Sequence, residues 1–152
     1  MYDTVYDTLG GMKGSSVGLA MTICAVALAA PATATPPVGA DVQTQSHNVV
    51  DGIEYTVTRI TVAPGGGTGW HYHPGEVFGF IAEGAMTHYD GSCVVDEVYD
   101  AGAPVKEGVG PDFVHNGRNL GSTPLVMEVV YINPVGAPLS VETPAPSGCV
   151  VS

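Results

Sequence analysis

The sequence has little positive charge. Its 152 residues include 4 Lys and Arg against 15 Asp and Glu, which gives a formal net charge of −11 with histidine neutral. This excess of acidic residues argues against nucleic acid and anionic membrane surfaces as partners, because both attract basic proteins. Only 12% of the residues are charged, whereas 45% are hydrophobic. This balance argues against an intrinsically disordered chain and provides enough apolar side chains for the core of one domain.

Helical signals are also missing from the body of the chain. After residue 34, no segment combines a helical apolar period with helix caps. Instead, 21 Gly and 12 Pro separate short runs of β-branched and aromatic residues, which is typical of an all-β sandwich or barrel. A hairpin is expected at Glu83-Gly84, and the last and most hydrophobic run is expected to be central. The predicted strands span residues 55–62, 70–73, 77–82, 86–89, 94–99, 105–106, 114–115 and 125–133.

Long hydrophobic runs are absent as well. The longest uncharged and mostly apolar run, residues 17–30, is shorter than the about 20 residues that a transmembrane helix needs. It follows Lys13 and precedes an A-x-A pattern ending at Ala34, which fits a signal-peptidase site. We therefore expect residues 1–34 to be a cleaved signal peptide, with Met12 as an alternative start, and the mature protein to be secreted without a stable membrane anchor. A retained anchor is the competing interpretation.

Cysteine is rare, and its count is informative. Of the 3 cysteines, removal of the signal would leave Cys93 and Cys149. An exported chain with an even number of cysteines is expected to form disulfides, and here only one pairing exists. The enclosed loop would stabilise the fold by about 4 kcal/mol on the chain-entropy model. With residues 35–48 as a linker and 49–136 as a barrel, the bridge would tie down a C-terminal tail, residues 137–152. Two unpaired thiols are the alternative.

The five histidines carry the chemical signal. His71 and His73 stand two residues apart, and in a strand such residues point to the same face, so both imidazoles can bind one ion. His115 follows 42 residues after His73 in another strand-like segment. Three imidazoles converging inside a small barrel would suit Zn, Fe, Cu, Ni or Mn. The sequence therefore predicts a divalent-metal site at these residues. We expect His88 to be an ordinary strand residue that faces solvent or a hydrogen-bond partner.

The histidine segments resemble the two motifs of the cupin superfamily, G-x5-H-x-H-x(3,4)-E-x6-G and G-x5-P-x-G-x2-H-x3-N. The residues that match are Gly65, His71, His73, Gly84, Gly102, Gly110, His115 and Asn119. The second motif departs at two points: Gly108 stands in place of its proline, and four residues, not two, separate Gly110 from His115. The resemblance covers residues 49–132. It implies a single-domain cupin double-stranded β-helix, a jelly-roll barrel, whose metal ligands would be the three histidines. The chain also resembles small exported single-domain cupins of the cupin 2 conserved barrel type, and this likeness does not supply a biochemical role.

One carboxylate departs from the first motif. Counting back from Gly84 places the expected Glu at Val77, whereas Glu76 stands one residue earlier. Strand alternation puts Val77 on the face of the histidines and Glu76 on the opposite face. Glu76 could turn inward only through a bulge or kink at Pro74-Gly75. Three versions stay open: Glu76 as a fourth ligand, a three-histidine site with open positions, and a site that holds no metal.

Two classes of function are consistent with such a barrel. The first is a metal-dependent enzyme acting on a small molecule, since oxygenase, isomerase and lyase chemistry occur in the resembled superfamily. The second is a non-catalytic module that binds a small ligand or a metal at a degenerate site. The sequence shows no Ser-His-Asp or Cys-His nucleophile pattern, which argues against covalent catalysis. The fold alone does not decide between the classes, and the oligomeric state stays open, with a homodimer as one option.

The signal peptide gives the first testable prediction. Cleavage after Ala34 should give an exported protein whose N-terminal residue is Thr35, because the A-x-A pattern ends there. N-terminal sequencing of the exported protein checks this. Recovery of an intact N-terminus from washed membranes would indicate the retained anchor instead.

Overall fold

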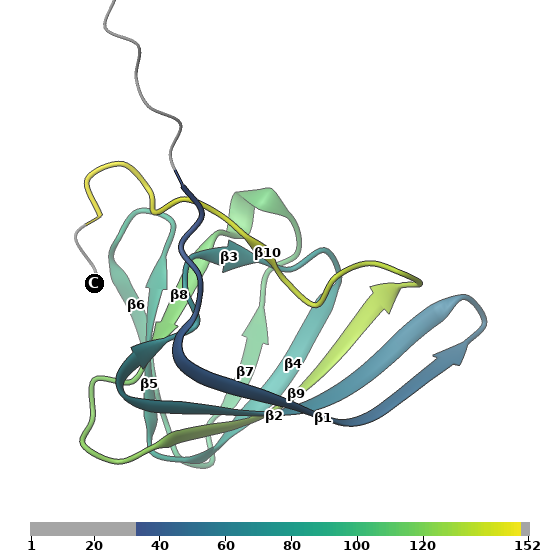
Figure 1. The fold of residues 1–152 in the computed structure, drawn as a ribbon, viewed down its shortest axis with the longest axis horizontal. Helices are drawn as coiled ribbons and strands as arrows, with labels where there is room; N and C mark the ends of the chain where they lie inside the picture. The colour runs from purple at the N-terminus through teal and green to yellow at the C-terminus, as the bar shows by residue number, and fades with distance from the viewer. Residues whose placement is uncertain (1–32, 150–152) are drawn as a thin grey trace, which may run out of the picture. The chain divides into compact units, whose positions relative to one another are not determined.

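The part of the chain that the structure, a computed structural model, describes is residues 33–149, and its strands form a nearly closed antiparallel barrel (Figure 1). In chain order the elements are β1 (Val38–Val50), β2 (Ile53–Gly67), β3 (His71–Tyr72), β4 (Glu76–Glu83), β5 (Ala85–Asp90), β6 (Val95–Asp100), β7 (Pro104–Glu107), the 3₁₀ helix η1 (Pro111–Phe113), β8 (His115–Arg118), β9 (Leu125–Pro134) and β10 (Val141–Glu142). Within this part, no helix has the length and apolar character needed to cross a membrane. The expected signal peptide lies outside the described residues, apart from Thr33 and Ala34.

The core lies between the inward faces of strands that alternate buried and partly exposed residues. In β2, Thr58, Ile60 and Val62 are buried and the residues between them are partly exposed, as expected for a strand with one face in the core. β9 pairs with β2 on one side and β4 on the other, which confirms its predicted central place. The buried hydrophobic residues that pack together are Ile60, Val62, Val77, Ile81, Met86, Val105, Leu125, Met127, Val129 and Tyr131.

Each predicted strand overlaps an observed one, but β1 and β10 fall outside the predictions. Residues 35–48 are expected as a linker, whereas residues 38–48 belong to β1, which pairs with β2 from Val38 opposite Gly67 to Val50 opposite Ile53. Nearly every residue of β1 is exposed on both faces of the strand. The segment therefore lacks the apolar alternation by which a half-buried strand is recognised in a sequence.

The predicted hairpin at Glu83-Gly84 is wrong. β4 pairs with β7 and β9, whereas β5 pairs with β6 and β8, so the chain leaves one set of strands at Gly84 and enters another (Figure 1). Gly84 has a φ of 75°, and a Cβ there would lie 2.6 Å from the carbonyl oxygen of Pro124. The glycine is therefore needed for a sharp change of direction against a neighbouring chain segment, which a sequence pattern does not distinguish from a hairpin turn.

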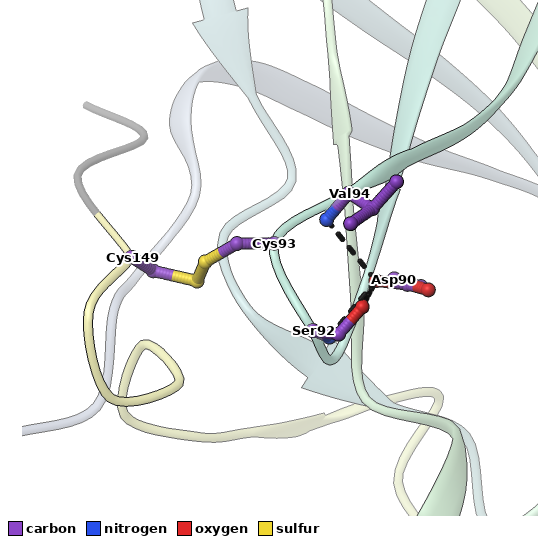
Figure 2. Close-up of a disulfide and its surroundings, with 5 residues drawn as sticks. All are labelled: Asp90, Ser92, Cys93, Val94 and Cys149. Atoms are coloured by element: carbon purple, nitrogen blue, oxygen red, sulfur yellow. Dashed lines mark hydrogen bonds between the residues drawn. A yellow bond between two sulfur atoms is a disulfide. The ribbon is translucent and has the colours of Figure 1, made fainter.

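The predicted disulfide is present. Cys93 lies in the loop between β5 and β6, and Cys149 lies in the C-terminal tail, with their Cα atoms 5.6 Å apart (Figure 2). The loop is ordered by the Asp90 carboxylate, which accepts hydrogen bonds from the amide and hydroxyl of Ser92 and from the amide of Val94 (Figure 2). The disulfide thus joins the tail to a loop with its own internal structure.

Gly84 yields a prediction about fold stability. Replacement of Gly84 by Ala should lower the free energy of unfolding by roughly 2–5 kcal/mol, because a left-handed backbone strains an L-residue and the added Cβ also meets Pro124. Gly102→Ala is the matched control: its φ is 89°, but nothing lies within 4 Å of the added Cβ, so only the strain of about 1–2 kcal/mol is expected. Denaturant unfolding of both variants measures the difference. Equal losses would contradict the close packing at Gly84.

Candidate metal centre

The structure brings the three predicted histidines together. His71 is in β3 and pairs in register with His115 of β8, and His73 follows two residues after His71. All three are buried, with exposed fractions of 7%, 2% and 4% for His71, His73 and His115. The Nε2 atoms of His71 and His73 are 3.2 Å apart. The same-face spacing that the sequence predicts therefore leads to a shared point inside the barrel.

Each imidazole is oriented from behind by a main-chain carbonyl. The Nδ1 atom of His71 lies 2.9 Å from the oxygen of Gly69, and that of His73 lies 2.7 Å from the oxygen of Leu139. The Nδ1 atom of His115 lies 2.8 Å from the carbonyl oxygen of Phe113. A carbonyl oxygen can only accept, so each Nδ1 carries the proton. In the neutral imidazole the Nε2 lone pair is then free, which is the arrangement that backbone-oriented metal ligands use.

A fourth group, Glu107 at the end of β7, completes the cluster. Its Oε2 atom lies 2.6 Å from Nε2 of His73 and 3.0 Å from Nε2 of His115. The ligand atoms of the three histidines and Glu107 all lie within 4.8 Å of one another, close enough to hold one metal ion. Glu107 is the direct cross-strand partner of Val77, and cross-strand partners point to the same face of a sheet. The carboxylate therefore enters beside the position at which the cupin motif places it.

The predicted ligand Glu76 needs correction. Glu76 is exposed and is not part of the cluster, whereas the next residue, Val77, is 3% exposed and points into the core. The ladder between β4 and β9 runs without a register shift from Glu76 to Ile81, so the strand keeps its alternation and no bulge turns Glu76 inward. The sequence contains one local sign of Glu107: it shares a strand face with the apolar Val105, as an inward residue would.

The charge of the cluster suits a bound cation. Burial alone would raise the pKa of Glu107, but hydrogen bonds from His115 and His73 outweigh it and hold the pKa well below its usual value. Burial lowers the pKa of His71 to about 3, helped by repulsion from the other two imidazoles. For His115, burial lowers the pKa, but the hydrogen bond and charge of Glu107 outweigh it and raise the pKa overall. A hydrogen bond from an imidazole Nε2 to Glu107 requires a proton on that nitrogen, and a divalent cation would take the place of that proton. The ionised carboxylate and the nitrogen lone pairs would then form a donor set that first-row divalent metals prefer.

A small apolar cavity adjoins the cluster on the core side. Its volume is about 40 Å³, and three of the four cluster residues line it together with Tyr131 and apolar core side chains. Burial raises the pKa of the Tyr131 hydroxyl, and the negative charge of Glu107 adds to the effect. The phenol therefore stays protonated and can donate a hydrogen bond next to the cluster.

The remaining histidines have other places. The Nδ1 atom of His88 lies 2.6 Å from the Asp96 carboxylate, and its ring stacks on that of His115 with centroids 5.0 Å apart. His88 thus has the hydrogen-bond partner expected for it, and it also packs directly beside the cluster. His47 is exposed and lies 2.7 Å from a carboxylate oxygen of Glu54, away from the cluster.

Comparison with solved structures places this barrel among known folds. A cupin domain from Bordetella pertussis Tohama I is 25% identical, with a TM-score of 0.53, over 62% of this chain and 94% of that chain. An uncharacterized conserved protein with a double-stranded β-helix domain from Klebsiella pneumoniae is 20% identical, with a TM-score of 0.55, over 71% of this chain and 84% of that chain. An oxalate oxidase in complex with glycolate is 23% identical, with a TM-score of 0.52, over 68% of this chain and 54% of the oxidase. The sequence matches no family model and no curated protein.

The two glutamates give a matched pair of variants. Glu107→Gln should weaken Zn²⁺ binding by about 100-fold or more, because the loss of even an outer partner of a metal ligand costs about 10–100-fold. Glu76→Gln removes the same charge from an exposed position and should leave the dissociation constant unchanged. Titration of both variants with Zn²⁺ against a competing chelator measures the effect. Weaker binding in Glu76→Gln together with unchanged binding in Glu107→Gln would restore the original ligand assignment.

Proposed function

Because the chain has the cupin double-stranded β-helix fold, we propose that it binds one divalent metal ion and uses it to act on a small organic molecule. The ligands would be His71, His73, His115 and Glu107. The observation that carries this proposal is the convergence of three buried imidazole nitrogens and one carboxylate oxygen within 4.8 Å. The Nε2 atoms of His71 and His73 lie 3.2 Å apart, with the Glu107 carboxylate 2.6 Å from Nε2 of His73, so nitrogen and oxygen donors converge where a cation would bind.

The chemistry that such a metal supplies is Lewis-acid or redox activation of a bound oxygen or carbonyl group. The protein's own residues hold the ligands in place, since backbone carbonyls fix the three imidazoles. The apolar side chains of the inner cavity keep bulk water from that side of the metal. Tyr131, which lines this cavity and stays protonated there, would donate a hydrogen bond to a group bound at the metal.

Two further parts of the proposal concern ligand and location. The oxalate oxidase that shares this fold was solved with glycolate, which supports a small molecule as the ligand of this barrel. The Cys93–Cys149 disulfide supports an extracytoplasmic location, since disulfides persist in oxidising compartments. A module that binds without turnover is the second candidate function. The inner cavity of about 40 Å³ favours it only in the form of a module that holds the metal itself, because most organic molecules would not fit there.

Metal content tests the proposed function. Protein produced in an oxidising compartment should contain one metal ion per chain by elemental mass spectrometry. His73→Ala should lose the metal, and His47→Ala, which removes an exposed histidine outside the cluster, should keep it. Wild-type protein that takes up no Fe, Mn, Zn, Ni or Cu would contradict the proposal.

Turnover then distinguishes the enzyme from the binding module. The metal-loaded protein is incubated with a panel of small hydroxy acids, keto compounds and amines. For an enzyme, Tyr131→Phe should keep the metal and reduce turnover by about 10²-fold or more, in the range found when a hydrogen-bond donor to a developing negative charge is removed. Full metal occupancy with no metal-dependent turnover on any panel member would favour the module.

A further inference from the structure

A larger groove opens beside the ligand cluster. Its volume is about 680 Å³, and Glu107 and His115 lie in its wall. Small-molecule sites have volumes of about 300–1,000 Å³, so the groove has the size of a binding site. The inner cavity, at about 40 Å³, has room for about three water molecules. Of these two cavities, only the groove is large enough for an organic ligand that reaches the cluster.

Two walls of the groove are joined by the disulfide. One wall is the β5–β6 loop, with Asp90, Gly91 and Ser92, and the other is the tail, with Thr143, Pro144 and Pro146. Cys93 follows directly after the first wall, and Cys149 lies three residues beyond the second (Figure 2). The tail is held at its start by the pairing of β10 with β3. The disulfide fixes its other end, so this covalent bond joins two of the segments that line the groove.

The groove is rich in carboxylates and poor in cations. Asp90, Asp96 and Asp112 line it beside Glu107, and Lys106 is the one Lys or Arg among its described lining residues. Asp96 lies 2.6 Å from His88, which also lines the groove, and Asp90 accepts hydrogen bonds within its own loop. The Lys106 ammonium lies 5.2 Å from the ring centroid of Phe78, a residue outside the groove lining. The chain as a whole carries a net charge of −11. The field in the groove therefore favours a positively charged ligand and disfavours an anion.

Aromatic rings also line the groove, and such rings are suited to an ammonium group. Tyr99 and Phe113 line the groove, and a cation over an aromatic face is attracted by the negative charge of the ring. Phe113 and Asp112 both belong to η1, and the carbonyl of Phe113 orients His115. The element that would contact the ligand is thus connected directly to the metal ligand.

On the basis of the proposed metal function, we propose that this groove binds the organic part of the ligand, a small molecule that carries a cationic amine. The carboxylate of Asp112 and the aromatic rings would contact the ammonium group, and a donor atom of the ligand would reach the metal at Glu107 and His115. The Cys93–Cys149 disulfide would hold the tail wall in the position that the ligand needs.

A pair of nearly isosteric probes tests the charge class on metal-loaded protein. Choline carries a quaternary ammonium that cannot coordinate a metal, and 3,3-dimethylbutan-1-ol has the same shape without the charge. Calorimetry should show choline binding about three- to tenfold more tightly than the neutral alcohol, the gain expected for a partly exposed ion pair together with a cation–π contact. Equal binding of both probes, tighter binding of glycolate than of choline, or no binding of choline would overturn the cationic class.

A matched pair of aspartate variants locates the binding. Asp112→Asn should remove most of the preference for choline and leave the affinity for the neutral alcohol unchanged. Asp41→Asn removes the same charge from β1, outside the groove, and should change neither affinity. Equal effects of the two variants would show a general charge effect and overturn the groove as the site.

Metal uptake is measured in parallel, so that failure of the two proposals can be distinguished. A wild-type protein that takes up no metal contradicts the proposed function. A wild-type protein that takes up metal but shows no preference for choline contradicts the groove alone.

The disulfide is tested in the same assay. The double variant Cys93→Ser, Cys149→Ser avoids a free thiol and should weaken choline binding by about tenfold in the metal-loaded protein, since an ordered wall no longer pre-organises the site. Wild-type protein treated with a mild reductant should show the same loss and regain affinity after reoxidation. Unchanged choline affinity in both forms would overturn the role of the disulfide.

Discussion

Hydrogen bonds from three imidazole Nδ1 atoms to backbone carbonyls are the constraint on which the centre of this protein depends. They decide which nitrogen carries the proton, and so they turn three lone pairs toward one point inside the barrel. Glu107 adds a negative charge at the same point. Such an arrangement is costly to bury unless a cation compensates it. The barrel strands supply the rigid support, because β3, β7 and β8 each deliver a ligand from a different part of the sequence.

The features that local patterns encode could be predicted from the sequence. His71 and His73 share a face because strand residues alternate, and His115 and Asn119 follow the spacing of a known motif. The disulfide follows from the cysteine count. The position of Glu107 could not be predicted, because its place beside Val77 depends on the pairing register of β4 and β7, whose residues are about 30 positions apart.

The same limit explains the errors in the fold. A glycine with positive φ occurs both in hairpins and at crossings between sheets, and only the tertiary partners of β4 and β5 distinguish the two at Gly84. The sequence did not reveal β1 for a different reason: among its residues only Ala40 packs against the core, so the strand carries no apolar alternation. The carboxylate of Glu107, which stands in for the one that the motif places at Val77, shows that a site can be kept although its local pattern is lost. A barrel can exchange a ligand between paired strands without moving the site, since cross-strand neighbours share a face.

The carbonyl partner of His73 has a consequence for the order of assembly. This partner is Leu139, which follows the last long strand of the barrel and precedes β10. A chain that has been synthesised only as far as β8 already contains all four residues of the cluster, but it lacks the group that sets the tautomer of His73. In the proposed metal site, high affinity would therefore arise only when the C-terminal segment has closed against the barrel, which would make metal uptake a late event that follows completion of the chain.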